Sequence, residues 1–330
     1  MGAEAVMARR DNRWSWVVTV VCGITLFPVG VARTAVVSTA RPNPLVGRWD
    51  LRVLDPAGAY PSWVEFSEAD GRVVGRFVGR IGGVRSLTIA RTERGRVWFE
   101  LPAQFEQRDG TLRFDGALHG SWMKGLTRTD RGQQVTWTAA RAPALESPSA
   151  PRWGKPIALL ESGDLSAWHS RKPGEELCWD LNQGVLANMG PCSDLVTKRT
   201  FRDFKLSLEF RIGDGGDSGV HLRGRYEIQL RDPVTFNLME SASATGSLYS
   251  FIGVPNDMGR PAGEWQSLEA TLLGRHLTVV LNGVTVIQDR EIPGITGDAL
   301  DADESRPGPI VLQGYLGPIS FRNIVVTPAE

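Results

Sequence analysis

Apolar and polar side chains alternate almost without error through residues 217–232, DSGVHLRGRYEIQLRD. Because successive side chains of a strand point to opposite faces, this alternation predicts extended chain with one core face and one polar face. The core face would carry Val220, Leu222, Ile228 and Leu230. The polar face would carry His221, Arg223, Glu227, Gln229 and Arg231. The sorting holds for one continuous strand or for a hairpin with a three-residue loop at Gly224, whereas a two-residue loop would mix the faces. This face holds more polar functionality than a solvated sheet needs, so we expect it to form the floor of a site.

The same alternation of apolar and polar residues occurs elsewhere in the second half of the chain. Residues 204–211 alternate without exception. Two further apolar runs flank Asn282-Gly283, the strongest signal for a two-residue hairpin turn. Residues 154–330 are therefore predicted to form an antiparallel β-sandwich.

Short alternating segments separated by glycine-containing turns fill the first half. They cover residues 47–53, 71–78, 96–101, 111–114 and 134–138. Many short strands at short spacing predict an up-and-down barrel or a curved sheet, so we expect a small β-barrel-like domain over 45–142. Its tryptophans could stack on sugar rings, but tryptophans on alternating strands more often fill a core. They are Trp49, Trp63, Trp98, Trp122 and Trp137.

Residues 143–153 are rich in proline, alanine and serine and show no periodicity. Such a segment is typical of a linker, here between the barrel-like domain and the sandwich. Long helical periods are hard to find and glycine is abundant, with 37 residues. The whole chain is therefore predicted to be all-β.

The first forty residues are typical of an export signal. Arg9, Arg10 and Arg13 precede an apolar run from Trp14 to Ala32. This order predicts a signal peptide over 1–40 and a secreted or periplasmic protein. The run is close to the length that spans a bilayer, so a membrane anchor is the alternative if the leader stays uncleaved.

Charge and cysteine content narrow the function further. The chain has 37 acidic and 37 basic residues, which argues against a nucleic-acid partner because phosphate binding normally leaves a basic excess. Removal of the leader leaves Cys178 and Cys192. In an oxidising compartment they are expected to form a disulfide, the alternative being two buried thiols. The four histidines are not spaced as a zinc motif requires.

The sequence Gly216-Asp-Ser218-Gly219 is similar to the nucleophile segment of chymotrypsin-like proteases. That chemistry needs a histidine base held by a buried aspartate, and His169 does not lie in a suitable context. We therefore expect the glycines to shape the entry into the strand rather than to flank a nucleophile.

A set of short segments keeps the order found in one known family. They are 201–210 (FRDFKLSLEF), 217–220 (DSGV), 226–232 (YEIQLRD), 261–265 (PAGEW), 281–284 (LNGV), 308–313 (GPIVLQ) and 321–324 (FRNI). Together they resemble the 3-keto-disaccharide hydrolase family over about residues 155–328. The resemblance implies a concanavalin- or laminin-G-like jelly roll and cleavage of sugars already oxidised to a ketone at carbon 3.

Such a ketone acidifies the hydrogen on carbon 2, so the chemistry needs a base, a positive group at the enolate oxygen and an acid for the leaving oxygen. On the matching positions, Glu227 is the first candidate for base or metal ligand, and Arg223 for the enolate oxygen. Gln229, Asp232 and Gln313 would bind the substrate, and His221 is an alternative base. The competing interpretation is a surface ion pair between Arg223 and Glu227.

Two positions depart from the family pattern. Where many relatives have Asp-His-Gly after Leu-Gln, this chain has Gly314-Tyr315-Leu316. If that histidine is catalytic, Tyr315 either replaces it, with a pKa less suited to base work, or the protein only binds sugar. Asp217 stands where asparagine is common and could ligate a divalent cation such as calcium, although no cofactor is firmly implied. The binding alternative is a lectin-like module whose cleft would use Trp265, Tyr249 and Arg223 for an oligosaccharide.

Overall fold

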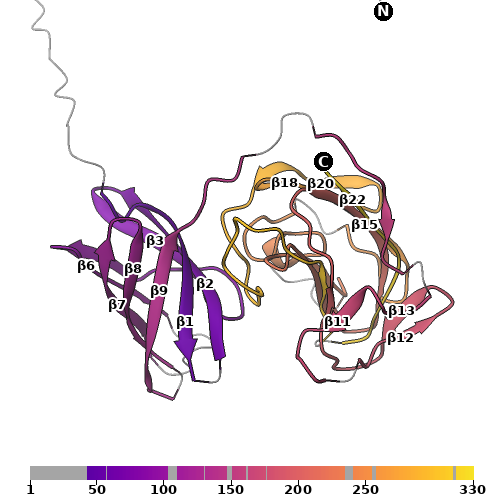
Figure 1. Cartoon of the computed structure of the whole chain (residues 1–330), viewed down its shortest axis with the longest axis horizontal. Helices are drawn as coiled ribbons and strands as arrows, with labels where there is room; N and C mark the ends of the chain where they lie inside the picture. Colours follow the sequence, from indigo (N-terminus) through magenta and orange to yellow (C-terminus); the bar gives the residue numbers. More distant parts are fainter. Residues whose placement is uncertain are drawn as a thin grey trace, which may run out of the picture. The chain divides into compact units, whose positions relative to one another are not determined.

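The computed structural model describes residues 43–330 apart from 57, 103–109, 130, 147–150, 161–162, 176, 235–240, 255–257 and 315–316. Regular structure in these residues is β-strand, apart from the short 3-10 turn Ser241–Ser243. Within this part of the chain, no helix has the length and apolar character needed to cross a membrane. The strands fall into two groups, β1 to β9 and the strands that follow (Figure 1). The predicted all-β fold class is confirmed. The predicted leader over 1–40 lies outside the described residues.

The first group is a single antiparallel sheet in the order β4-β3-β2-β1-β9-β8-β7-β6-β5. Its strands are β1 Gly47–Asp55, β2 Gly58–Ala69, β3 Arg72–Val78, β4 Arg85–Ser86, β5 Ile89–Glu93, β6 Arg96–Leu101, β7 Leu112–His119, β8 Trp122–Arg128 and β9 Gln134–Arg141. Because the first strand pairs with the last, the meander curls into the barrel-like form that the short alternating segments predict. Its core is aromatic, and Phe99 stacks on Phe114 with ring centroids 4.7 Å apart.

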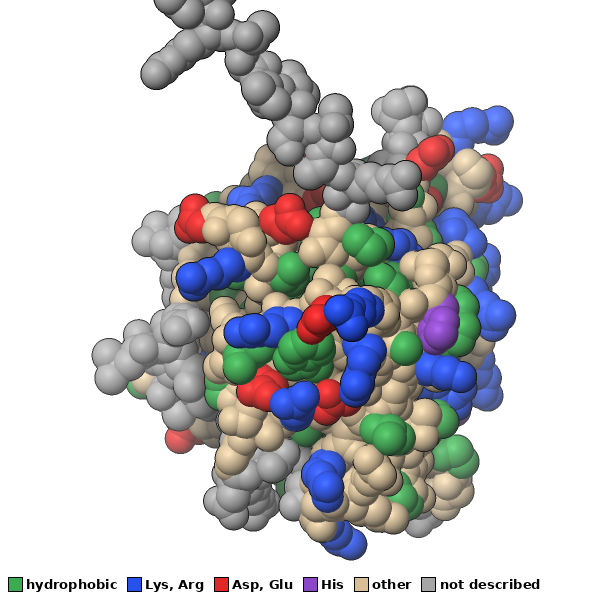
Figure 2. Space-filling view, turned by 90° about the vertical axis from the view of Figure 1, so that its left-hand side faces the viewer, with side chains coloured by type: hydrophobic (Ala, Val, Ile, Leu, Met, Phe, Trp, Pro, Cys, Tyr) green, Lys and Arg blue, Asp and Glu red, His purple; other side chains and the backbone are tan. Residues whose placement is uncertain are grey.

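The tryptophans of this region do not all share one environment. Trp49 and Trp137 fill its core, as expected, whereas Trp63 is buried in the core of the second region. Trp122 is 44% exposed on the outer face of β8. Figure 2 shows one face of the molecule, on which lysine, arginine, aspartate and glutamate side chains are interspersed with separate hydrophobic ones. This mixture of signs on one face matches the equal numbers of acidic and basic residues in the chain.

The second region is a sandwich of two sheets. One has the order β12-β13-β22-β15-β18-β19-β20, with β10 beside β22, and the other has the order β11-β14-β21-β16-β17. The first sheet comprises β10 Ile157–Ala158, β12 Asp180–Asn182, β13 Val185–Asn188, β15 Phe204–Ile212, β18 Gln266–Leu273, β19 His276–Leu281, β20 Val284–Glu291 and β22 Ile319–Pro328. The second comprises β11 Trp168–Ser170, β14 Leu195–Thr197, β16 Asp217–Leu222, β17 Tyr226–Arg231 and β21 Val311–Leu312.

The alternation in the sequence explains the packing between these sheets. The inward side chains of β15, which include Phe204 and Phe210, are buried as predicted, while the residues between them face outward. The turn between β19 and β20 has positive φ at both Asn282 (51°) and Gly283 (81°), the conformation that Asn-Gly favours.

The barrel-like region and the sandwich lie in one compact unit, residues 42–330. The Trp63 ring packs edge-on against Phe251 of the sandwich, with centroids 5.5 Å apart. Gly294 permits this contact, because a Cβ there would lie 2.3 Å from the Trp63 indole. Arg48 of β1 and Glu291 of β20 add an ion pair at 3.2 Å. The boundaries 45–142 and 143–153 remain predictions, but the two regions share buried contacts.

Candidate active site

The β16–β17 hairpin has the geometry that keeps its two faces separate. Leu222 pairs with Tyr226, so residues 223–225 form a three-residue loop. Val220, Leu222, Ile228 and Leu230 are fully buried in the sandwich core. The predicted sorting of apolar and polar side chains is therefore confirmed for the two strands.

Cross-strand pairs define the polar face. His221 lies opposite Glu227, Gly219 opposite Gln229, and Asp217 opposite Arg231. A Cβ on Gly219 would lie 2.6 Å from Oε1 of Glu227, so the missing side chain makes room for the carboxyl group. Gly219 thus has a role inside the strand, not only at its entry as expected. Ser218 points to the other face and donates its hydroxyl to the carbonyl of Gln313 at 2.8 Å, a structural contact.

His221 and Glu227 are buried rather than exposed on an open floor, with 1% and 5% of their surface accessible. Burial raises the pKa of Glu227 well above its usual range, and the negative charges of Asp298 and Asp217 raise it further. Burial lowers the pKa of His221, against the opposing effect of Asp298 and Asp194. Burial therefore shifts both groups toward their uncharged forms, a carboxylic acid and a neutral imidazole. Nε2 of His221 is buried and has no hydrogen-bond partner among the described residues.

An arginine held by two aspartates lies near this pair. Nη1 of Arg171 donates to Oδ2 of Asp194 at 2.9 Å and to Oδ2 of Asp298 at 2.6 Å. Nη2 of Arg171 also donates to the carbonyl of Asp298 at 3.0 Å. The positive charge of Arg171 lowers the pKa of His221, which places the guanidinium within electrostatic reach of the imidazole. Sequence reasoning missed these three residues, because they come from three separate segments and share no motif.

Asp217 and Gln229 form a second polar group beside Glu227. The side chain of Gln229 donates to Oδ1 of Asp217, and Nη2 of Arg231 donates to Oδ2 of Asp217 at 3.1 Å. Burial raises the pKa of Asp217 despite the opposing charge of Arg231. Among the described residues no group of three or more histidine, cysteine, aspartate or glutamate side chains has a metal-binding arrangement. Calcium at Asp217 remains a prediction.

Asp232 follows β17 and serves the neighbouring turns. Its Oδ2 accepts from the amide of Gly215 at 3.0 Å, and its Oδ1 accepts from the amide of Val234 at 3.1 Å. These contacts hold the chain at the entry to β16 and the exit from β17. The Asp232 carboxylate therefore binds backbone amides, and it is Glu227, not Asp232, that lies opposite His221.

Arg223 does not share the face of Glu227, contrary to the sequence prediction. It lies in the hairpin loop with φ of 53°, and its Nη2 donates to Oδ1 of Asp203 at 2.8 Å. Its Nε donates to the carbonyl of Arg202. The strand alternation ends at Leu222, because the turn begins at Arg223 and redirects the Arg223 side chain. The expected ion pair between Arg223 and Glu227 is likewise replaced by the pair with Asp203.

The residues expected to form a lectin-like cleft are not brought together. Trp265 precedes β18 on the larger sheet and packs between Arg211 and Arg322, whose guanidinium carbons lie 5.0 and 4.1 Å from its ring centroid. Tyr249 instead lies beside β17, where its amide donates to the carbonyl of Glu227 at 2.9 Å. Burial raises the pKa of Tyr249, and the charge of Glu227 raises it further.

Gln313 joins the site from β21. Its amide donates to the carbonyl of Gly219 at 2.9 Å, and its buried Oε1 has no hydrogen-bond partner in the described part of the chain. At Gly314 a Cβ would lie 2.9 Å from the Trp179 ring and 3.0 Å from the carbonyl of Cys192. This crowding requires glycine where the family pattern has aspartate. Tyr315 lies outside the described residues.

Cys178 and Cys192 are joined in a disulfide with Cα atoms 5.8 Å apart. The amide of Cys192 donates to the carbonyl of Gly314 at 3.1 Å, and the amide of Gly314 donates to Oδ1 of Asp194 at 3.0 Å. The disulfide therefore supports the backbone that positions Asp194.

The barrel-like region holds two segments at the edge of the site. The carbonyl of Arg80 accepts from the amide of Asp298 at 2.9 Å. The amide of Val84 donates to Oγ of Ser250 at 2.8 Å, next to Tyr249. A Cβ on Gly297 would lie 2.3 Å from the carbonyl of Gly82, so the two backbones are in close contact. One short loop, residues 80–84, thus anchors both Asp298 and the neighbour of Tyr249.

Comparison with known proteins gives a family match to the second region. The model of a 3-keto-alpha-glucoside-1,2-lyase-like domain matches residues 155–327. Two solved proteins from Parabacteroides distasonis ATCC 8503, both provisionally named glycosyl hydrolases, are similar to this chain. One is 28% identical, covers 56% of this chain and 92% of its own, and has a TM-score of 0.47. The other is 25% identical, covers 53% and 100%, and has a TM-score of 0.43.

A carbohydrate-binding module of Bacillus subtilis is 11% identical, covers 48% of this chain and 93% of its own, and has a TM-score of 0.30. No curated protein matches the chain.

Proposed function

Because the chain belongs to the family of 3-keto-alpha-glucoside-1,2-lyase-like domains, we propose that it cleaves glycosides whose sugar carries a ketone at carbon 3. The family supports a carbohydrate-active, hydrolase-like role. The choice of a 3-keto substrate and the roles of individual residues are our proposal, argued from the chemistry of the polar face.

His221 is the proposed base. In the first step its neutral imidazole takes the proton from carbon 2, and the electrons of the C–H bond form a double bond between carbons 2 and 3. The negative charge moves onto the former ketone oxygen. The lowered pKa of His221 supports this role, because the imidazole is free to accept a proton at neutral pH.

Glu227 is the proposed acid. The enolate expels the group on carbon 1, the bond between carbon 1 and oxygen breaks, and the departing oxygen takes the proton of Glu227. Water then adds to carbon 1 of the enone and gives a proton to the Glu227 carboxylate. The His221 imidazolium exchanges its proton with water and then gives a solvent-derived proton to carbon 2. The raised pKa of Glu227 supports the role, because a carboxyl group must keep its proton at neutral pH to act as an acid.

Arg171 is the proposed partner of the enolate oxygen, in place of Arg223. A fixed cation stabilises developing negative charge most strongly where water is excluded. The pairs with Asp194 and Asp298 fix the guanidinium near His221. Arg223 cannot take this role from the hairpin loop, where Asp203 holds it.

The observation that carries the proposal is the cross-strand pair of His221 and Glu227, both displaced toward their uncharged forms. The test is incubation of the purified protein with a 3-keto-disaccharide, with release of the two monosaccharide products followed by chromatography. Release by the wild type and its loss in Glu227→Gln would support the proposal. Sugar binding without any release would favour a binding module instead.

Export is part of the same proposal. The leader-like sequence of residues 1–40 and an oxidised pair at Cys178 and Cys192 both suit a secreted or periplasmic protein. We expect the sugar substrate to be met there.

A further inference from the structure

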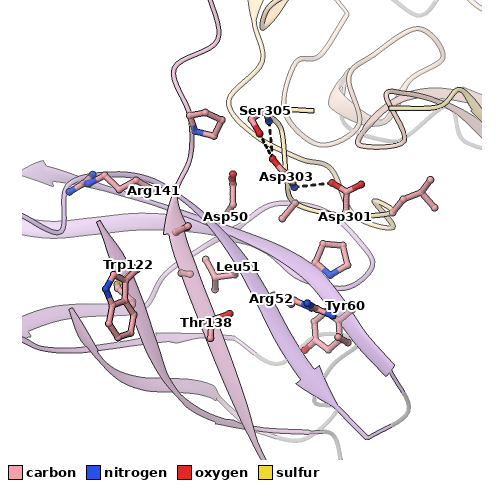
Figure 3. Close-up of a pocket in the computed structure, with 18 residues that line it drawn as sticks. Asp50, Leu51, Arg52, Tyr60, Trp122, Thr138, Arg141, Asp301, Asp303 and Ser305 are labelled. Carbon is pink, nitrogen blue, oxygen red and sulfur yellow. Dashed lines mark hydrogen bonds between the residues drawn. The ribbon is translucent and has the colours of Figure 1, made fainter. Parts of the chain in front are cut away.

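A groove of about 810 Å³ lies outside the proposed active site (Figure 3). Its floor is the outer face of the barrel-like sheet at β1, β2, β8 and β9, and the loop at residues 300–305 forms the opposite wall. None of the residues that form the His221–Glu227 site lines it. The volume falls within the range of small-molecule sites, about 300–1,000 Å³.

Strand register explains the composition of the floor. Ala140 of β9 pairs with Trp122 of β8 on one side and with Asp50 of β1 on the other. In the next row outward, Thr138 pairs with Arg52 of β1. The short side chains in the middle, Ala140 and Thr138, leave a shallow platform between an exposed indole on one side and a carboxyl and a guanidinium on the other.

The opposite wall is fixed before any ligand arrives. Oδ1 of Asp301 accepts from the amide of Asp303 at 2.8 Å and from Nε of Arg225 at 2.7 Å. Oδ1 of Asp303 accepts from the amide of Ser305 at 3.2 Å. Figure 3 shows the bonds among Asp301, Asp303 and Ser305 and shows Asp50 directed toward this loop. A preformed wall lowers the ordering cost of binding.

Asp50 lines this groove close to the Glu304 carboxylate. Burial and the nearby Glu304 carboxylate, with which Asp50 shares a hydrogen bond, together raise the pKa of Asp50 to about 8, against the lowering effect of Arg275 and Arg48. At neutral pH the side chain is then mostly a carboxylic acid, able both to donate and to accept a hydrogen bond. Because Asp50 is only partly buried and lines the groove, its carboxyl group can exchange hydrogen bonds with a ligand hydroxyl.

The chemistry of the lining selects a class of ligand. Charged side chains of both signs line the groove, Arg52 and Arg141 together with Asp301 and Asp303, so a strongly ionic ligand gains little. Trp122 and Tyr60 add aromatic surface. A molecule with apolar C–H faces and many hydroxyl groups matches this combination, because it can pack on an indole and bond to carboxyl and guanidinium groups together.

We propose that the groove binds a short neutral oligosaccharide, with Trp122 as the stacking platform and Asp50 and Arg52 as hydroxyl partners. It would hold the sugar chain without cleaving it, as a second binding site beside the catalytic one. The proposal does not depend on the 3-keto chemistry, because the probes below need no ketone.

The test is calorimetric titration of the full chain with maltotriose and, separately, with cellotriose. We expect saturable binding of at least one trisaccharide, with a Kd on the order of 0.1–1 mM. Trp122→Ala should weaken it at least about tenfold, since buried aromatic contacts carry much of a binding energy. Arg52→Ala should weaken it about threefold or more by loss of a charge-assisted hydrogen bond.

The matched control is Leu126→Ala. Leu126 is on the same strand as Trp122 and is equally exposed, at 44%, but it does not line the groove. This variant should bind the trisaccharides as the wild type does. All these side chains are exposed, so their thermal midpoints should stay near that of the wild type.

No saturable heat with either trisaccharide would overturn the proposal, and so would equal binding by wild type and Trp122→Ala. Turnover of a 3-keto-disaccharide is measured on the same variants, and we expect Trp122→Ala to retain it. If turnover is absent from every variant while trisaccharide binding is lost only in Trp122→Ala and Arg52→Ala, the groove stands and the catalytic proposal fails.

Discussion

Glu227 on β17 lies directly opposite His221 on β16, and the carboxyl group extends over the gap left by Gly219. Burial displaces both groups toward their uncharged forms. An acid and a base are thus held side by side on one ladder, with Arg171 within electrostatic reach of the imidazole.

Replacement of Glu227 should remove turnover without unfolding the protein. Glu227→Gln keeps the volume and the hydrogen-bonding reach but removes the transferable proton, so we expect turnover of a 3-keto-disaccharide to fall at least about a hundredfold. Initial rates of product release at saturating substrate measure this. Turnover at the wild-type level would exclude Glu227 as the acid or base and point to His221 acting with another group.

The same variant should change how stability depends on pH. A carboxyl group whose pKa is raised by folding stabilises the folded state only while it stays protonated, so its contribution falls as pH rises from the unfolded pKa through the folded one. Gln at position 227 has no proton to lose. The thermal midpoint of Glu227→Gln should therefore rise relative to that of the wild type as pH increases above the usual pKa of glutamate. Parallel curves for the two proteins would show that the carboxyl group is not raised in pKa.

His221→Gln should reduce turnover at least about a hundredfold, by loss of the proposed base. The matched control is His169→Gln. His169 lies in the same cross-strand row as His221, separated from it by Val196 and Val311, but its side chain is exposed. That variant should keep wild-type rates, and equal losses in both variants would contradict the assignment of His221.

The pH profile of the wild type should be bell-shaped. Rates should fall at low pH as His221 becomes protonated. Because the pKa of His221 is lowered, this fall should occur below the usual titration range of histidine. Rates should fall again at high pH as Glu227 loses its proton. Because the pKa of Glu227 is raised, this fall should occur well above the usual titration range of glutamate. Measurement of kcat/KM against pH reports both groups in the free enzyme. A rate that only increases with pH would contradict the role of Glu227 as an acid.

The contact between residues 80–84 and the site can be tested at Gly297. Gly297→Ala places a Cβ 2.3 Å from the carbonyl of Gly82, so the backbone next to Asp298 must move. We expect a loss of about 1–3 kcal/mol in the free energy of unfolding and a fall in kcat. Gly190→Ala is the control, because nothing lies within 4 Å of its added Cβ. Equal behaviour of the two variants in urea unfolding and in turnover would show that this contact does not position the site.

The disulfide should also matter to the site. Thiol labelling of the unreduced protein should find Cys178 and Cys192 unreactive, and the double serine variant should lose roughly 3 kcal/mol of stability, the value expected for a loop of about 15 residues. Two reactive thiols in the unreduced protein would contradict the pairing.

Much of the fold could be predicted from the sequence, because strand period and turn chemistry are local. The alternation in β15 and in the β16–β17 hairpin, and the Asn282-Gly283 turn, all follow from residues close together in the chain. The same local signal placed His221, Glu227 and Gln229 on one face. It misplaced Arg223, because alternation does not mark the residue at which a strand turns.

The rest of the site depends on contacts between distant segments. Arg171, Asp194 and Asp298 meet only after both sheets have formed, and residues 80–84 reach the site from the other region. No short pattern in the sequence carries that information. Trp122 shows a similar limit, since strand alternation suggested a core tryptophan and the register instead places it on an outer face.

The central claim is that a proton leaves carbon 2 before the glycosidic bond breaks, and deuterium incorporation tests it most directly. A 3-keto-disaccharide is cleaved in deuterated water, and the released keto sugar is examined by NMR and mass spectrometry, with the same sugar incubated without protein as the control for spontaneous exchange. We predict one deuterium at carbon 2 of the product, gained at the rate of cleavage and absent when Glu227→Gln replaces the wild type. Cleavage by the wild type with the original hydrogen retained at carbon 2 would contradict the account.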